Sequence, residues 1–251
     1  VLGFSTVNRQ PVALARQRAT YFAELDTALP FVRATRNDVF DAQSFKEVFS
    51  STTGSFNWFY ADADDIAFIH TGLYPRRASG VHPDLPSWGD GTADWTGFLQ
   101  LQDLPQETNP PRGYLASWNN RPAVDWWSAD DNSTYQLVHR NDMLDVPLTQ
   151  LVAEGNITLA RLTEIMTDAG VTDLRGQEIL PAAIDLLNRG SISGDISEAL
   201  NLLQTWHDNG AWRRDRNNDG RYDEEAAVAL MDAWYTRMIE RLLPQVTALE
   251  N

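Results

Sequence analysis

The pattern of apolar residues changes near residue 145, and this change restricts the possible folds more than any other feature of the chain. Up to that point, short runs with strand composition alternate with turns rich in proline and glycine. The predicted strands are 5–7, 12–16, 57–60, 66–70 and 114–118, and a helical stretch is expected at 44–51. After that point, apolar residues recur at helical spacing instead. The sequence therefore predicts an α+β fold with a strand-rich region, 1–145, and a helical region, 146–251.

Several helix ends are recognisable in the second region. Thr158 is a suitable N-cap for a helix that Gly170 can end, and Pro181 is expected to start or kink another helix. The segment from Asp195 to Glu198 has the residues of a capping box. The last helix carries a long apolar stripe made of Val228, Met231, Trp234, Met238, Leu242 and Leu243. We interpret these stripes as core packing, and we predict no organic cofactor.

The charge and the cysteine content exclude several classes of protein. With a net charge of −15, the chain lacks the basic surface that binding to a nucleic-acid phosphate backbone requires. It contains no cysteine, which excludes disulfides, thiolate catalysis and cysteine-ligated zinc. No apolar run reaches the roughly 18 residues of a membrane-spanning helix. At 251 residues, the chain is long enough to bury one large core or two small ones.

The stretch 109–122 is the most informative for chemistry. Prolines and a glycine lead into a predicted strand that ends in Trp118, Asn119 and Asn120. Amide side chains at a rigid strand end offer neutral N–H donors. Such donors stabilise the oxyanion that forms when a nucleophile adds to a carbonyl group. The alternative is that the two asparagines only form a turn.

Further motifs precede this stretch in a specific order. They are Asn-Trp-Phe-Tyr-Ala-Asp at 57–62, Ile-Ala-Phe-Ile-His-Thr-Gly at 66–72, Tyr-Pro-Arg-Arg at 74–77, Gly-Val-His-Pro-Asp-Leu-Pro at 80–86 and Asp-Trp-Thr-Gly-Phe at 94–98. Together with the Trp-Asn-Asn motif, this series resembles the β subunit of the penicillin acylase family of N-terminal-nucleophile (Ntn) hydrolases. The resemblance covers about residues 1–145 well and continues more loosely through the helical region.

The resemblance implies that the first region is part of an Ntn-hydrolase αββα core. It also implies hydrolysis of a small-molecule amide by an N-terminal serine whose own α-amine acts as the base. On the positions that match, Asn119 would be the oxyanion donor. Arg140 would orient the surroundings of the nucleophile or a polar group of the substrate. The alternative for Arg140 is a surface ion pair with Asp142 or Asp145.

The substrate is expected to carry an apolar acyl group. Most of the nine tryptophans lie in the first region, and we expect Trp58 and Trp118 to line an acyl pocket there. The substrate could be an amide of a β-lactam, an acyl-homoserine lactone or a lipopeptide, and the sequence does not select among them.

The chain departs from the family pattern at its first residue. It begins with Val1, which has no hydroxyl or thiol group, and Ser5 is internal, so the nitrogen of Ser5 is an amide and cannot act as a base. We therefore expect an internal piece of a β subunit that is inactive alone. Its partners would be the remaining α and β segments of the parent acylase. The resemblance also implies a periplasmic or secreted protein.

Residues 215–223 resemble a calcium-binding loop. Oxygen-bearing side chains occupy positions one, three, five and nine of an EF-hand pattern, with glycine at six for the sharp turn. The seventh position would contribute its backbone carbonyl, and the twelfth is alanine in place of the usual glutamate, which Glu224 or Glu225 could replace. The predicted Ca²⁺ ligands are Asp215, Asn217, Asp219, Arg221 and Asp223. Alternatively, the segment is an acidic turn in which Asp223 caps the following helix.

The resemblance implies a second possible calcium site in the first region. Its ligands would include the carbonyl of Pro83 and a carboxylate shortly after the Trp-Asn-Asn motif. That carboxylate is Asp130 or Asp131.

Two other functions remain open. The chain could be a calcium-stabilised binding or structural domain without catalysis, and the missing nucleophile favours this alternative. A self-contained hydrolase that uses Asp62 and Asp94 would also fit, although paired carboxylates occur in any acidic protein.

Overall fold

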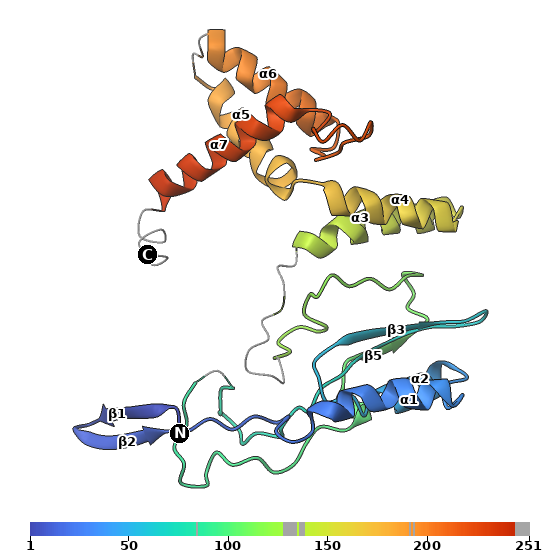
Figure 1. Ribbon diagram of the computed structural model, residues 1–251, viewed down its shortest axis with the longest axis vertical. Helices are drawn as coiled ribbons and strands as arrows, with labels where there is room; N and C mark the ends of the chain where they lie inside the picture. Colours follow the sequence, from blue (N-terminus) through green and yellow to red (C-terminus); the bar gives the residue numbers. More distant parts are fainter. Residues whose placement is uncertain (84, 128–134, 136–138, 191, 193, 244–251) are drawn as a thin grey trace. The chain divides into compact units, whose positions relative to one another are not determined.

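The computed structural model describes residues 1–83, 85–127, 135, 139–190, 192 and 194–243. The chain divides into two compact units, Val1–Asn141 and Asp142–Asn251 (Figure 1). All strands of the described residues lie in the first unit, whereas the second unit is helical. The predicted α+β fold, strand-rich first and helical afterwards, is confirmed. The predicted boundary after residue 145 lies within helix α3 (His139–Glu154) and stays a prediction.

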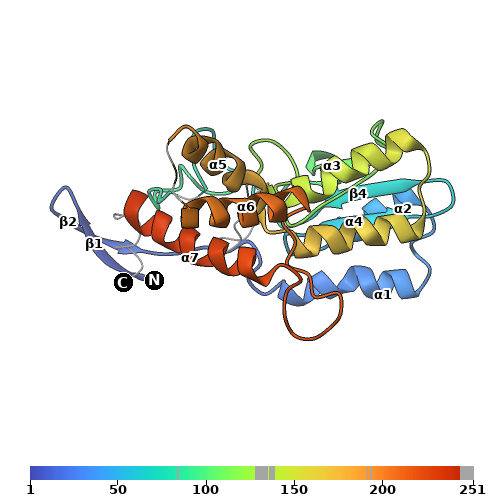
Figure 2. The same ribbon diagram turned by 90° about the horizontal axis from the view of Figure 1, so that it is seen from above.

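The first unit is built around a three-stranded antiparallel sheet (Figures 1 and 2). Its order is β3, β4, β5, and the strands are β3 (Asn57–Ala61), β4 (Ile66–His70) and β5 (Gln106–Thr108). In the β3–β4 hairpin, Asn57 lies opposite His70. Ala61 lies opposite Ile66 at the other end of the hairpin. The predicted strands at 57–60 and 66–70 are confirmed.

A short acidic turn joins β3 to β4. The Oδ1 atom of Asp62 accepts hydrogen bonds from the backbone N–H groups of Asp64 and Asp65, at 2.8 and 2.7 Å. The backbone N–H of Asp62 donates to the carbonyl of Asp65 at 3.0 Å. The turn is therefore held by its own aspartates, as is usual for this residue type.

Helix α2 (Ala42–Phe49) packs against β3 and β4, and α1 (Leu29–Thr35) packs against α2 (Figure 1). Asp41 caps α2, because its carboxylate accepts from the backbone N–H of Ser44 while the Ser44 hydroxyl accepts from the N–H of Asp41. Short 3₁₀ turns occur at Glu24–Ala28 and Leu101–Asp103. The helix predicted at 44–51 is confirmed. The buried core of this unit consists of Ala42, Phe45, Val48, Phe49, Ala67, Ile69, Tyr74 and Leu104.

Strands β1 (Gly3–Val7) and β2 (Gln10–Leu14) form a separate antiparallel hairpin that extends away from the three-stranded sheet (Figures 1 and 2). The two turn residues, Asn8 and Arg9, have positive φ angles of 49° and 65°. This conformation matches the right-handed twist of a tight hairpin. The predicted strands at 5–7 and 12–16 are confirmed, although β2 begins and ends earlier than predicted.

The prediction of a strand at 114–118 is wrong, because this segment has no regular structure. Local side chains bind the backbone groups that strand pairing would use. The Arg112 guanidinium donates to the carbonyl of Tyr114 at 2.9 Å, and the Trp118 N–H donates to Oδ1 of Asn120 at 2.9 Å. The Trp-Asn-Asn motif therefore lies on a loop that is bonded to its own side chains.

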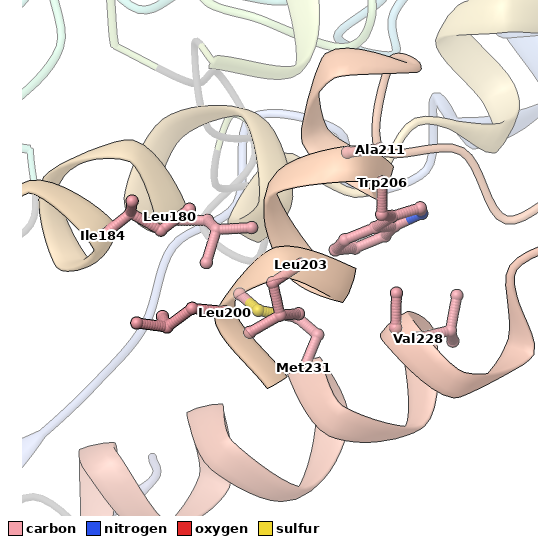
Figure 3. Packing of buried hydrophobic residues seen from close by; sticks show 9 residues of the cluster. Leu180, Ile184, Leu200, Leu203, Trp206, Ala211, Val228 and Met231 are labelled. Atoms are coloured by element: carbon pink, nitrogen blue, oxygen red, sulfur yellow. The ribbon is translucent and has the colours of Figure 1, made fainter. Parts of the chain in front are cut away.

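The second unit begins within α3, and its described residues continue through four further helices and a π-helical turn. These elements are α4 (Leu159–Val171), the π turn (Arg175–Ile179), α5 (Leu180–Asn188), α6 (Gly194–Asp208) and α7 (Glu225–Leu242). Helix α6 packs against both α5 and α7. Among the described helices, none combines the length and the apolar character that a bilayer span requires. The core of the unit contains Leu180, Ile184, Leu200, Leu203, Trp206, Ala211, Ala227, Val228 and Met231 (Figure 3).

Trp206 on α6 is completely buried in this core (Figure 3). Its indole N–H donates to the carbonyl of Trp212 at 2.9 Å, so the polar atom of the ring is satisfied. The backbone of the π turn lies directly against the ring. A Cβ atom at Gly176 would lie 2.6 Å from the Cβ of Ala211 and 2.8 Å from the Trp206 ring. Only glycine fits at this position without movement of the core.

Two aspartates and two arginines form an ion-pair network in the second unit. The Asp173 side chain is only 5% exposed and accepts hydrogen bonds from Arg175 at 2.6 and 3.0 Å and from Arg213 at 2.8 Å. Both arginines also donate to the carboxylate of Asp232. Burial by itself raises the pKa of Asp173, but the bonds from Arg175 and Arg213 together outweigh it, so this pKa lies below its ordinary value.

The predicted helix ends are partly confirmed. The Thr158 hydroxyl accepts from the backbone N–H of Arg161 at 3.3 Å and caps α4, which ends one residue later than predicted. Pro181 lies in the first turn of α5, as predicted. The capping-box prediction is wrong, since α6 already begins at Gly194. Asp195 therefore lies inside the first turn, where the helix dipole favours a negative charge.

Candidate active site

Asn119 lies on an exposed turn of the Trp-Asn-Asn loop. Its φ angle of 59° is in the left-handed region, which asparagine adopts more readily than most residues. Within the part of the chain that the structure describes, the Asn119 side chain has no hydrogen-bond partner. Its amide N–H groups are therefore available to another molecule or to another part of the protein.

Asn57, at the start of β3, holds this turn from both sides. Its Nδ2 atom donates to the Ser117 hydroxyl at 2.8 Å and to the carbonyl of Asn120 at 3.2 Å. Inside the turn, the Trp118 N–H donates to Oδ1 of Asn120 at 2.9 Å. Ser117 and Asn120, on either side of Asn119, are thus both bonded to the Asn57 amide of the sheet. This arrangement fixes the backbone that carries Asn119.

His70 in turn fixes the amide of Asn57. Nδ1 of His70 lies 2.7 Å from Oδ1 of Asn57, and Nε2 contacts the Tyr74 hydroxyl. Because the Asn57 nitrogen donates to Ser117 and Asn120, its oxygen must accept from His70 Nδ1–H. Nε2 must then accept from the Tyr74 O–H. Burial lowers the pKa of His70 to about 4, so the ring is neutral at neutral pH.

Further polar and aromatic groups enclose the His70 ring. The Tyr135 hydroxyl lies 3.3 Å from both His70 Nε2 and the Tyr74 hydroxyl. The Ser55 hydroxyl lies 3.1 Å from that of Tyr74, and the Trp126 ring packs edge-on against Tyr74 with 4.9 Å between the ring centroids. Burial also raises the pKa of Tyr135, so its hydroxyl stays protonated. The groups that touch His70 are therefore neutral hydrogen-bonding partners.

We expect protonation of His70 to lower the free energy of unfolding by up to about 3 kcal/mol as the pH falls from 6.5 to 4. The unfolded chain binds the proton near pH 6.5, whereas the folded protein binds it only near pH 4. The stability associated with the neutral ring is therefore complete above pH 6.5 and is lost through this window. Urea unfolding at a series of pH values measures the effect. His70→Gln should lack this part of the pH dependence, and the exposed control His139→Gln should keep it. Identical profiles for His70→Gln and the unaltered protein would contradict this expectation.

In the structure, Arg140 contacts the ring of Trp118. The guanidinium carbon of Arg140, at the start of α3, lies 4.9 Å from the centroid of the Trp118 ring. This is the distance of a cation–π contact. Two predicted site residues therefore meet next to Asn119. The predicted roles of Arg140, and the alternative of an ion pair with Asp142 or Asp145, stay predictions.

Trp58 lies in an aromatic cluster beside the sheet. Its indole N–H donates to the Thr71 hydroxyl at 3.0 Å, which fixes the ring. The ring centroids of Phe31, Phe49 and Phe56 lie 5.3, 5.2 and 5.5 Å from that of Trp58. Phe31 and Phe56 are about half exposed, at 48% and 50%. The cluster therefore offers an apolar surface, and substrate binding by Trp58 and Trp118 stays a prediction.

Side-chain oxygens of two predicted calcium ligands, Asp215 and Asn217, bind the same backbone N–H group. The Asp219 backbone N–H donates to Oδ1 of Asp215 and to Oδ1 of Asn217, both at 3.1 Å. The N–H of Gly220, which has a φ angle of 84°, donates to Oδ2 of Asp215 at 2.8 Å. The N–H of Arg221 donates to Oδ1 of Asp219 at 2.9 Å. The oxygen-bearing side chains thus face a common set of backbone groups.

Asp223, in contrast, is bound to Arg216. It accepts from the Arg216 backbone N–H at 3.2 Å, and its carboxylate lies 3.5 Å from the guanidinium. The alternative that Asp223 caps α7 is wrong, because Glu224 occupies the N-cap position without a side-chain bond. Across the described residues, no three or more His, Asp and Glu side chains are grouped closely enough to hold a metal ion. Calcium ligation by Asp223 would require Arg216 to move away.

The second possible calcium site is only partly covered by the structure. Pro83 lies in the loop that follows residue 77. Asp130 and Asp131 lie outside the described residues, so this site stays a prediction.

Sequence analysis missed the pair of Asn57 and His70. The hairpin sequence contained a signal for this pair, because the length of the turn between two strands fixes which residues lie opposite each other. Counting outward from the turn places these two residues opposite each other. The bonds from Asn57 to Ser117 and Asn120 had no comparable signal in the sequence.

The chain is similar in structure to a thermostable penicillin G acylase from Alcaligenes faecalis. The TM-score is 0.65 and the identity is 22%, and the match covers 85% of this chain and 39% of that chain. The likeness confirms the predicted fold, part of an Ntn-hydrolase core followed by a helical region.

The chain belongs to the penicillin amidase family, whose model matches residues 7–249. It is 29% identical over 187 residues to penicillin G acylase of Escherichia coli. That match covers 74% of this chain and 21% of that protein. It is 37% identical over 67 residues to acyl-homoserine lactone acylase QuiP of Pseudomonas fluorescens. That match covers 26% of this chain and 8% of that protein. The chain therefore spans about a fifth of the length of the Escherichia coli relative. The predicted family is confirmed.

Proposed function

We propose that this chain is part of an acylase-like amidohydrolase that cleaves an acyl-amide bond, with Asn119 as a donor to the oxyanion. The observation that carries the proposal is the exposed Asn119 amide, unbonded within the described residues, on a turn that Asn57 holds from both sides. A neutral donor that is fixed before the reaction stabilises the developing charge without reorganisation. The family match and the names of the two relatives, both acylases, support this reaction class.

The nucleophile is proposed to be an N-terminal serine in a part of the parent protein outside these residues. Its hydroxyl would attack the carbonyl carbon while its α-amine takes the proton, and the carbonyl oxygen would become the oxyanion. The remaining α and β segments of the parent acylase would then be the partners of this chain. The 21% share of the Escherichia coli relative that the chain covers supports such further segments.

Arg140 and the aromatic residues are proposed to bind the substrate around Asn119. Stacking on Trp118 limits the rotamers of Arg140, so its fork of donors would orient a polar substrate group or the surroundings of the nucleophile. Trp58, with its half-exposed phenylalanine neighbours, would contact an apolar acyl group. The candidate substrates are amides of a β-lactam, an acyl-homoserine lactone or a lipopeptide. The names of the relatives support the first two.

Hydrolysis by the intact parent protein tests this function. Amine release is measured from a chromogenic phenylacetyl amide, from acyl-homoserine lactones of several chain lengths and from a lipopeptide. Turnover of at least one class is expected. Failure with all three would favour the second candidate, a calcium-stabilised binding or structural domain without catalysis. A periplasmic or secreted location is proposed from the family resemblance, and fractionation of cells that produce the intact protein tests it.

We further propose that the 215–223 loop binds calcium. The support is that Asp215 and Asn217 share the Asp219 N–H, and that the Asn217 amide lies 3.0 Å from the Asp219 carboxylate. Binding to the folded protein alone would add roughly 2.7 kcal/mol of stability at a calcium concentration one hundred times Kd. The melting temperature should therefore rise with added calcium and fall with a chelator. Thermal unfolding of metal-free protein with and without calcium measures this shift.

Three variants test whether the shift comes from this loop. Asp219→Ala should remove most of it, because the variant lacks a ligand at the centre of the loop. Asp195→Ala, an exposed aspartate on α6, should keep it. Arg216→Gln should enlarge it by freeing Asp223. Identical melting curves with calcium and with chelator would show that the loop is only an acidic turn.

A further inference from the structure

The direction of the Asn119 amide depends on its backbone. The side chain has no hydrogen-bond partner within the described residues, so no bond of its own fixes where its N–H groups point. The left-handed φ angle of 59° is also less favourable than an extended or helical one. A donor that must act at one place therefore needs other residues to hold its turn.

Asn57 is the residue that holds the turn. One nitrogen, Nδ2, donates to the side chain two residues before Asn119 and to the backbone carbonyl one residue after it. These bonds connect the loop to the first residue of β3, which pairs with β4 in the three-stranded sheet. Both N–H groups of the Asn57 amide donate to residues of the Trp-Asn-Asn loop. The Ser117 and Asn120 bonds thus restrain the turn on either side of its apex.

The amide of Asn57 is itself held in a single orientation. His70 faces it across the hairpin and donates from Nδ1 to Oδ1, while Tyr74 donates to Nε2 of His70. A rotated amide would place its N–H groups against the N–H of His70. The chain of bonds therefore runs in one direction, from Tyr74 through His70 and Asn57 to the turn.

We propose that Asn57 is a positioning residue for amide hydrolysis, which holds the Asn119 turn so that the Asn119 amide reaches the oxyanion. This inference rests on the proposed role of Asn119. Asn57 touches neither the substrate nor the reacting atoms. Its whole contribution to the rate passes through the position of one donor. Removing the Nδ2 donor should therefore lower kcat, leave KM nearly unchanged, and have no effect once Asn119 is gone.

A double-mutant cycle in the intact acylase tests the proposal. Asn57→Asp keeps an oxygen for His70 and replaces the donating nitrogen. It is expected to lower kcat about tenfold, which is less than the roughly hundredfold loss that a misplacement of about 1 Å can cause. In the Asn119→Ala background, the same change should lower kcat by less than about twofold, because the group it positions is absent. A purely structural role would lower kcat by the same factor in both backgrounds.

Two further variants keep the test decisive if Asn57→Asp folds poorly. Ser117→Ala removes one of the two bonds and should give a smaller fall in kcat that again disappears in the Asn119→Ala background. Asn109→Gly is the matched control, because Asn109 also joins a loop to β4, through Ile66, at the opposite end of the hairpin. Glycine tolerates the positive φ at this position. This control should lower the melting temperature without changing kcat.

The outcomes separate the two proposals. If Asn119→Ala leaves kcat unchanged, the oxyanion role fails, and the positioning role fails with it. If Asn119→Ala lowers kcat but Asn57→Asp and Ser117→Ala do not, only the positioning proposal is overturned. Equal effects of these two variants in both backgrounds would overturn it as well. Loss of the effect in the Asn119→Ala background supports it.

Discussion

Replacing Asn119 by alanine is expected to lower kcat of the proposed parent acylase about a hundredfold or more, with KM nearly unchanged. Loss of one oxyanion donor removes roughly 2.7–4 kcal/mol of transition-state stabilisation. The ground-state amide carries little charge on its oxygen, so binding of the substrate should change little. Steady-state kinetics with a chromogenic amide measure both constants. A kcat near that of the unaltered enzyme would mean that Asn119 only forms the turn.

Backbone strain must be separated from loss of the donor in this experiment. Alanine at a φ angle of 59° is strained, whereas glycine is not, so Asn119→Gly should lose the same activity as Asn119→Ala. Asn37 is a matched control, because it is also exposed and has a φ angle of 63°. Asn37→Ala should leave kcat unchanged.

Asp173→Ala is expected to destabilise the helical unit by about 3 kcal/mol, because it leaves Arg175 and Arg213 without their most buried partner. Urea unfolding near neutral pH measures this loss. The lowered pKa of Asp173 means that its contribution is complete above pH 3.8 and is lost as the pH falls below that value. The difference between the variant and the unaltered protein should therefore shrink in acid.

An exposed ion pair provides the control for this second expectation. Asp185 on α5 and Arg189, the C-cap of α5, form an ion pair one helical turn apart, and their side chains are 66% and 71% exposed. Asp185→Ala should cost no more than about 0.5 kcal/mol, because solvent screens such pairs. A loss for Asp173→Ala as small as that for Asp185→Ala would show that the network contributes little to stability.

The parts of the fold that could be predicted from sequence are the local ones. Strands β3 and β4 need only each other and a turn that Asp62 closes through its own neighbours. Strand β5 has three polar residues and pairs with β4 across a long irregular segment, so its sequence carries no pattern. The segment 114–118 has strand composition, but bonds from Arg112 and Asn120 satisfy its backbone instead. Composition does not reveal this competition.

The candidate site shows the same limit. Asn119 could be predicted because its motif is contiguous, and Arg140 because the residues around it match a motif of a known family. The bonds from Asn57 to Ser117 and Asn120 span 60 and 63 positions. Arg213 reaches Asp173 across 40 positions. Such bonds depend on tertiary packing between distant segments, which a single sequence does not encode in any local pattern.

The hairpin register has an evolutionary consequence. Asn57 faces His70 only because the turn at 62–65 has a fixed number of residues between Ala61 and Ile66. Inserting or deleting one residue there would slip the pairing and turn the His70 side chain to the opposite face of the sheet. Substitutions in the turn would leave the register intact. Relatives that keep the bond between Asn57 and His70 should therefore differ freely in the composition of this turn while its length stays constant.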